Sequence, residues 1–295
     1  MGYAAIIICY IHWGLVPIYW KLLQGIEPVE LMMYRLVFSS LIAFALMVLR
    51  KKWRDFATGF QSWRSTGFIG ISALAVGINW FTFMWMVVND RVAESSLGYF
   101  LCPFVSISLG FIFEKERPSF LQWVAVAFAG VGVSIMGMRM GYLPFPALVI
   151  AVSWGFYSLL KKRSALGPMT SLAGESVFML PVAVGYLWWL GARSSLEWSG
   201  EDIGFRSLVA STGVVTVLPL FIYSFAAKKL TLTAIGLFQY LTPTISLLLA
   251  VFHFGEPFGM NEALVFGFIW LGLALYIGEK LRAFWFGNKA VTQTA

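Results

Sequence analysis

Apolar residues fill the chain in ten long segments, separated by short stretches that carry proline, glycine and charged residues. The segments are roughly residues 3–23, 31–49, 67–88, 95–113, 120–138, 142–160, 171–190, 207–227, 233–254 and 263–283. A helix needs about 20 mostly apolar residues to cross a bilayer. The pattern therefore predicts an all-α integral membrane protein with ten transmembrane helices.

The composition excludes a soluble domain. Of the 295 residues, 59% are hydrophobic and only 12% are charged, which is about half of the ~25% charge of an ordinary soluble domain. The two cysteines, Cys9 and Cys102, both lie inside apolar segments, so we expect buried thiols and no disulfide scaffold.

The loop cations predict the orientation. If the N-terminus is cytoplasmic, 15 of the 21 Lys and Arg residues lie at cytoplasmic helix ends and five at outer ends, while Arg35 falls within a span. Cationic residues near helix ends stay on the cytoplasmic side, so both termini, including the tail 287–295, are predicted to be cytoplasmic. The net charge of +7 is then a topology signal, and no nucleic-acid partner is expected.

The polar loop 50–66 carries aromatic residues at helical spacing, namely Trp53, Phe56, Phe60 and Trp63. This spacing predicts a short interfacial helix on the inner leaflet. The alternative is that these rings form part of an aromatic belt at the ends of two spans.

The chain also contains an internal repeat. At an offset of 140, Leu97, Leu101, Pro103, Ser106, Glu116 and Gly132 recur as Leu237, Leu241, Pro243, Ser246, Glu256 and Gly272. At 141, Trp13 and Gly14 recur as Trp154 and Gly155. Each half therefore has five spans, residues 1–139 and 142–286. An odd number of spans makes the second half enter the membrane from the opposite side, which is an inverted-topology repeat.

Inverted repeats favour transport, because they allow two equivalent arrangements that open to opposite sides around a midplane site. The alternative is that the duplication only helps a helix bundle to fold. A channel is a further alternative, although the sequence shows no ring of like charges and no carbonyl filter. No catalytic, metal-binding or phosphate-binding motif is present, so we expect neither an enzyme, a cofactor, a metal nor ATP coupling.

Three ionisable residues within the spans are candidate coupling sites, because charge is costly in hydrocarbon. Arg35 and Glu175 lie about one turn inside the second and seventh spans and are 140 positions apart. We interpret them as two separate polar groups on the pathway, and the alternative is that both extend to the interface. His12 in the first span could titrate near neutral pH, although a structural role is the simpler interpretation. A proton or cation is the expected coupling ion.

The matched prolines Pro103 and Pro243 are predicted hinges, since each removes a backbone hydrogen bond in mid-span. Nearby aromatic and amide side chains are candidates to line the pathway: Trp13, Asn79, Trp80, Tyr99, Phe100, Trp154, Tyr157, Gln239 and Tyr240. This mixture suits an amphiphilic or aromatic metabolite or drug. For any one of these residues, packing or lipid contact is the alternative.

These motifs together resemble the EamA type of the drug/metabolite transporter superfamily, and within it the RarD group. The residues that carry the resemblance are Trp13, Gly14, Arg35, Asn79, Trp80, Glu94 to Phe100, Pro103, Glu116, Arg117, Glu175, Leu180 to Val182, Phe238 to Tyr240, Pro243, Thr244, Gly255 and Glu256. The resemblance implies a ten-helix permease of the bacterial inner membrane that exports small molecules. The chain departs from the family pattern at Cys102, Ser106 and Lys115.

Overall fold

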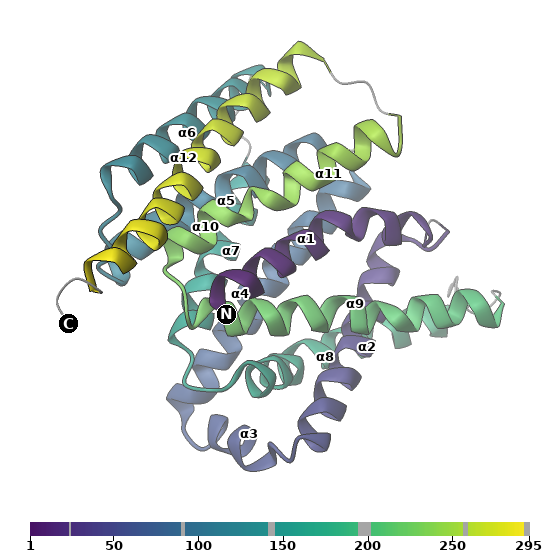
Figure 1. The fold of residues 1–295 in the computed structure, drawn as a ribbon. Helices are drawn as coiled ribbons and strands as arrows, with labels where there is room; N and C mark the ends of the chain where they lie inside the picture. Colours follow the sequence, from purple (N-terminus) through teal and green to yellow (C-terminus); the bar gives the residue numbers. More distant parts are fainter. Residues whose placement is uncertain (24, 90–91, 141–144, 194–201, 256–258, 292–295) are drawn as a thin grey trace.

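The computed structural model describes all residues except 24, 90–91, 141–144, 194–201, 256–258 and 292–295 (Figure 1). The described part of the chain is helical and contains no strand. The helices are α1 (Gly2–Lys21), α2 (Pro28–Leu49), α3 (Trp53–Gly59), α4 (Trp63–Val88), α5 (Val92–Phe113), α6 (Phe120–Met140), α7 (Phe145–Arg163), α8 (Pro168–Ala192), α9 (Ile203–Ala227), α10 (Leu232–Gln239), α11 (Leu241–Phe252) and α12 (Met260–Val291).

Each predicted apolar segment falls on a helix, and the ninth is divided between α10 and α11. Within the described residues, six stretches are long and apolar enough to cross a membrane: α1, α2, residues 63–86 of α4, α8, α9 and residues 232–249. The chain is therefore a multi-pass membrane protein, while crossing by all ten segments stays a prediction.

Local sequence explains where several helices begin. The Glu27 carboxylate accepts the backbone N–H of Glu30, and Pro28 occupies the first turn of α2, where its missing N–H costs nothing. Asp202 caps α9 through the N–H of Phe205 in the same way. These caps satisfy backbone donors that have no partner inside the helix.

The helices pack across the two halves of the sequence. α6 and α12 lie side by side along one edge of the molecule (Figure 1). α5 packs on α7, α1 packs on α9 and α11, and α2 packs on both α8 and α9. Large apolar side chains such as Leu41, Ile71 and Trp188 remain exposed on the outside, as is expected of a surface that faces lipid.

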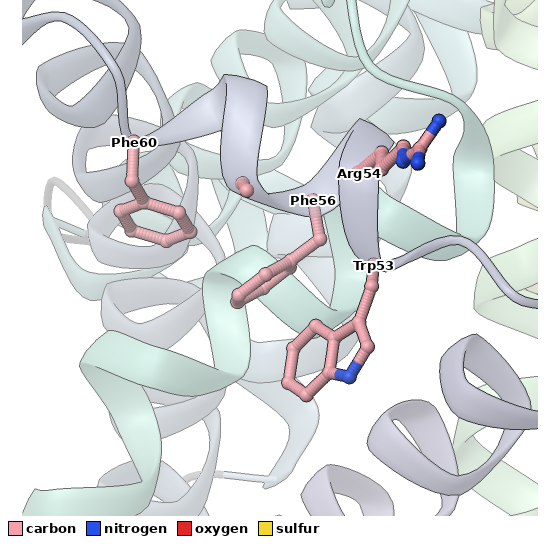
Figure 2. A pocket seen from close by; sticks show the side chains of 5 residues that line it. Trp53, Arg54, Phe56 and Phe60 are labelled. Carbon is pink, nitrogen blue, oxygen red and sulfur yellow. The ribbon is translucent and has the colours of Figure 1, made fainter.

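The expected short helix in the loop 50–66 is present as α3. The rings of Trp53, Phe56 and Phe60 lie on one side of it and Arg54 points away (Figure 2). These side chains line an open hollow of about 530 Å³, and Phe56 also contacts Phe44 of α2. The hollow is an apolar surface feature that includes none of the predicted pathway residues. The location of α3 at a membrane surface stays a prediction.

Candidate functional site

An aromatic cluster joins the first helices of the two halves. The rings of Trp13 and Trp154 are 5.3 Å apart, and Tyr223 contacts both, at 5.6 and 5.3 Å. Tyr157 stacks on Tyr223 at 6.3 Å, and the Tyr223 hydroxyl is 2.5 Å from Ser158 Oγ. The structure thus brings three of the predicted pathway residues into one aromatic group, in which Trp154 and Tyr157 are buried and Trp13 is partly buried.

Buried polar atoms without partners lie on the helices around this cluster. Asn79 donates from Nδ2 to the Ile150 carbonyl (2.9 Å) and to Ser153 Oγ (3.2 Å). Among the described residues, no hydrogen-bond partner reaches Asn79 Oδ1, Trp154 Nε1 or Gln239 Oε1. Unsatisfied polar atoms are rare in folded interiors, and these three are buried atoms that the described protein groups leave without a partner.

Phe100 of α5 and Tyr240 between α10 and α11 are in direct contact. Their rings stack at 6.4 Å, and the Tyr240 hydroxyl donates to the Phe100 carbonyl at 3.3 Å. Both side chains are buried. Tyr99, the neighbour of Phe100, instead contacts Phe83 of α4.

Glu175 is the centre of a buried polar network. Its Oε1 atom is 2.6 Å from Lys161 Nζ and accepts a hydrogen bond from Ser72 Oγ, also at 2.6 Å. The Tyr157 hydroxyl donates to Oε2 at 3.4 Å, and Lys161 also donates to Ser171. Glu175 and Lys161 are 4% and 1% exposed, so the ion pair between α7 and α8 is removed from solvent, and Ser72 connects it to α4.

Arg35 lies in different surroundings. Its guanidinium carbon is 4.2 Å from the centre of the Trp80 ring and 5.8 Å from that of Trp20. Within the described residues Arg35 forms no ion pair, with Glu175 or any other carboxylate, and its Nε atom is shielded and lacks a hydrogen-bond partner. Arg35 and Glu175 thus have different neighbours, and their role as two separate polar groups on a pathway stays a prediction.

The remaining candidate residues are His12, which contacts a backbone carbonyl, and the prolines Pro103 and Pro243, which lie within helices. His12 Nε2 is 3.1 Å from the Val215 carbonyl, which favours the tautomer with a proton on Nε2. Pro103 lies inside the continuous helix α5. Pro243, its repeat equivalent, lies in the first turn of α11, just after the interruption at Tyr240. The two prolines thus occupy different local structures.

The sequence did not predict the side-chain contacts that join the loop after α5, the end of α7 and the start of α10. Glu116 accepts the N–H groups of Leu232 (2.7 Å) and Thr233 (3.0 Å) at the start of α10. Lys162 Nζ donates to the Leu230 carbonyl at 2.5 Å and is 3.8 Å from Glu116.

Two further contacts connect the same end. Arg163 pairs with Glu114 at 2.6 Å, and Lys228 donates to the Leu166 carbonyl. Partial burial lowers the pKa of Lys228 from its ordinary value. All of these connections belong to loops that the cation count places on the cytoplasmic side. The sequence signals for them were the repeated glutamate, Glu116 and Glu256, at which the two halves match, and the place of Glu116 in the family resemblance.

Lys161 was also missed. The sequence places it in a cytoplasmic loop with Lys162 and Arg163, but α7 continues through Arg163 and buries Lys161 against Glu175.

Among the described residues, no group of three or more His, Cys, Asp or Glu side chains could hold a metal ion.

Comparison with known proteins identifies the family. The chain matches the EamA-like transporter family over residues 1–138 and again over 144–278. It is 36% identical to an uncharacterized transporter of Vibrio cholerae, over 96% of this chain and 93% of that protein. It is 35% identical to Protein RarD of Escherichia coli K12, over 92% of each chain.

The fold is also similar to that of a solved crystal structure, with a TM-score of 0.70, 18% identity and coverage of 93% of this chain and 96% of that chain. The protein therefore belongs to the EamA-like transporter family of multi-pass membrane proteins, and its relatives include bacterial RarD proteins. The expected resemblance to EamA and RarD proteins is confirmed.

Proposed function

We propose that the protein is a secondary active transporter that exports small organic metabolites or drugs across the bacterial inner membrane by alternating access between two inverted five-helix repeats. The halves are residues 1–139 and 142–286, with a cytoplasmic tail at 287–295 and both termini in the cytoplasm. In this proposal a proton or cation gradient drives the transport.

The observation that carries the proposal is that repeat-equivalent residues contact each other. Trp13 touches Trp154, 141 positions away, and Phe100 touches Tyr240, 140 positions away. In an assembly of two similar halves related by a twofold axis, only residues at the axis can contact their own equivalents. Two such pairs support an axis that passes through the middle of the bundle, as expected of inverted repeats.

Contacts away from this axis are also duplicated. A Cβ on Gly14 would meet Ile245, and a Cβ on Gly155 would meet Val105, which are equivalent contacts because 105 and 245 are 140 apart. These glycines let α1 approach α11 and α7 approach α5 closely.

One contact of the first helix of each half also falls at equivalent positions, although the donor differs. Asn79 Nδ2 donates to the Ile150 carbonyl, and at the equivalent pair Cys9 Sγ donates to the Pro219 carbonyl. Cys9 is the equivalent of Ile150, and Pro219 is that of Asn79. Matched contacts at matched sites support two interchangeable arrangements of the halves.

In the proposed pathway the aromatic cluster and its unpaired polar atoms contact substrate. Trp13, Asn79, Trp80, Tyr99, Phe100, Trp154, Tyr157, Gln239 and Tyr240 line it. Glu175 takes part in coupling, Arg35 holds a polar end of the substrate, His12 supports α1, and Pro103 and Pro243 permit bending. An amphiphilic or aromatic substrate fits this combination of rings and few hydrogen-bonding groups.

A channel or uncoupled facilitator is the alternative function. It would use the same lining residues without closing either side. The polar contacts at one end, from Glu116 to Leu232 and from Arg163 to Glu114, favour a carrier because they connect loops of the two halves to each other at that end.

A reconstituted assay tests the proposal. A thermal-shift screen against amino acids, aromatic metabolites and antibiotics selects a ligand that raises the melting temperature, and its counterflow is measured in proteoliposomes with and without an imposed pH gradient. A carrier shows faster exchange when the ligand is present on both sides. Flux that rises linearly with concentration and shows no such acceleration would establish the channel instead.

Variants separate coupling from binding in the same assay. Glu175→Gln is expected to lose gradient-driven accumulation and keep exchange, while Arg35→Ala weakens both. The control is Asp55→Asn, which removes an exposed carboxylate that pairs with Lys52 on α3 and is expected to leave both activities unchanged.

A further inference from the structure

Arg35 is a partly buried cation that forms no ion pair among the described residues, and its Nε atom is shielded without a hydrogen-bond partner. Its guanidinium lies over the Trp80 ring and near the Trp20 ring. Indole faces attract a cation but accept none of the five N–H groups that a guanidinium presents. The geometry therefore leaves N–H donors available on a charge that is costly in a membrane interior.

The equivalent place in the second half shows how such a charge is neutralised. There Glu175, the equivalent of Arg35, pairs with Lys161 at 2.6 Å. The equivalent of Lys161 in the first half is Trp20, 141 positions earlier, and Trp20 faces Arg35. The second half thus has a complete ion pair in the protein itself, whereas the first half has a cation and an aromatic ring.

The Trp80 ring lies 4.2 Å from the guanidinium carbon and the Trp20 ring lies 5.8 Å from it. A guanidinium beside aromatic rings keeps the planar fork of N–H donors that matches the two oxygens of a carboxylate or similar anion. A ligand with an aromatic or aliphatic body next to that anion would also contact Trp80, which is packed among apolar residues including Met179 and Met84.

We propose that Arg35 binds the anionic group of the substrate, so that the transported molecules are organic anions with an apolar body, of the carboxylate type. This rests on the proposed transport function for its physiological meaning. The opposite charges of the two halves then have different roles. Glu175 with Lys161 takes part in coupling, and Arg35 with Trp20 and Trp80 recognises the substrate.

The test is equilibrium binding by purified protein in a neutral detergent, and it requires no transport. Three probes of similar shape are compared by thermal shift: 3-phenylpropionate, its neutral amide 3-phenylpropionamide, and the cation 3-phenylpropylamine. Wild-type protein is expected to be stabilised by the carboxylate and little by the other two.

Variants locate the effect. Arg35→Gln is expected to weaken carboxylate binding by about tenfold or more, and Arg35→Lys by less, because lysine keeps the charge and loses the two-pronged geometry. Arg193→Gln is the matched control, since Arg193 also lies over a tryptophan, Trp189 at 4.1 Å, at the end of α8, and it is expected to bind as the wild type does.

Three results would overturn the proposal: equal binding of the three probes, no binding of the carboxylate, or wild-type affinity in Arg35→Gln. A further arm adds vesicles of phosphatidylglycerol, whose headgroup is also anionic. Displacement of phenylpropionate by this lipid in an Arg35-dependent manner would assign the anion to lipid instead of substrate. Anion binding without counterflow would leave this inference standing and remove the proposed transport function.

Discussion

At the scale of single residues, the buried pair of Glu175 with Lys161 shows what sequence could and could not reveal. Glu175 was predictable because it interrupts an apolar segment. Lys161 was not, because it precedes Lys162 and Arg163 and so has the pattern of a loop. Whether a lysine at a helix end is buried depends on the neighbouring helix. Here α8 places the Glu175 carboxylate within hydrogen-bonding distance of Lys161.

Breaking this pair from one side is predicted to destabilise the protein. Lys161→Met and Glu175→Gln are each expected to lower the free energy of unfolding, Lys161→Met by about 3–5 kcal/mol because it leaves a buried carboxylate unpaired. Glu175→Gln leaves a buried ammonium, with some hydrogen bonding retained. The double variant is expected to lose much less than the sum. Denaturant unfolding in detergent measures all three, and additive losses would show that the two groups do not interact.

At the scale of helices, the two prolines occupy equivalent positions in different structures. α5 is continuous through Pro103, whereas the second half is divided at Tyr240 into α10 and α11 with Pro243 in the first turn. Sequence predicted both prolines as matched hinges, because it records only that a backbone donor is missing. Which helix actually breaks depends on its packing, and the hinge role itself stays a prediction.

The two substitutions to alanine are therefore predicted to differ. Pro103→Ala restores a donor toward the Tyr99 carbonyl in a helix interior, so we expect a gain of about 1 kcal/mol in stability and slower transport. Pro243→Ala adds a donor in a first turn, where helices leave such groups unpaired, and should change stability little. Paired unfolding and counterflow measurements test this; identical effects in both variants would contradict it.

The contact of Glu116 with α10 leads to another prediction. Its carboxylate accepts two backbone N–H groups and the Thr233 hydroxyl (2.8 Å), so Glu116→Ala should loosen the start of α10, with a loss of about 1–3 kcal/mol. Hydrogen exchange at Leu232 and Thr233 is expected to accelerate. The matched control is Glu114→Ala, which breaks the exposed contact with Arg163 and should leave hydrogen exchange at Leu232 and Thr233 unchanged. Equal acceleration of exchange in both variants would contradict a specific role of Glu116 at the start of α10.

At the scale of the whole molecule, hydropathy predicted the positions of the helices well, because the bilayer requires long apolar helices regardless of their partners. The repeat was also visible in sequence, since identical residues recur at a fixed offset. The side-chain contacts across the halves, such as Ser72 with Glu175, were not predictable, because they depend on how helices distant in sequence are arranged.

The membrane orientation is predicted to place residue 62 in the cytoplasm and residue 203 outside. Single cysteines in place of Ser62 and Ile203, with Cys9 and Cys102 replaced by alanine, should react with a membrane-impermeant thiol reagent from opposite faces. Ile203 is 80% exposed at the start of α9, so access does not limit the reaction. Reaction of both from the outside would contradict the ten-span topology.

The central claim, alternating access between inverted repeats, is tested most directly by two equivalent pairs of spin labels. Trp63 with Ile112 and Ile203 with Phe252 are related by the offset of 140, and all four are exposed at helix ends. Double electron–electron resonance in nanodiscs would record both distances with and without ligand. We predict reciprocal changes, one pair separating as the other approaches. Distances that stay fixed, or that increase together, would contradict the account.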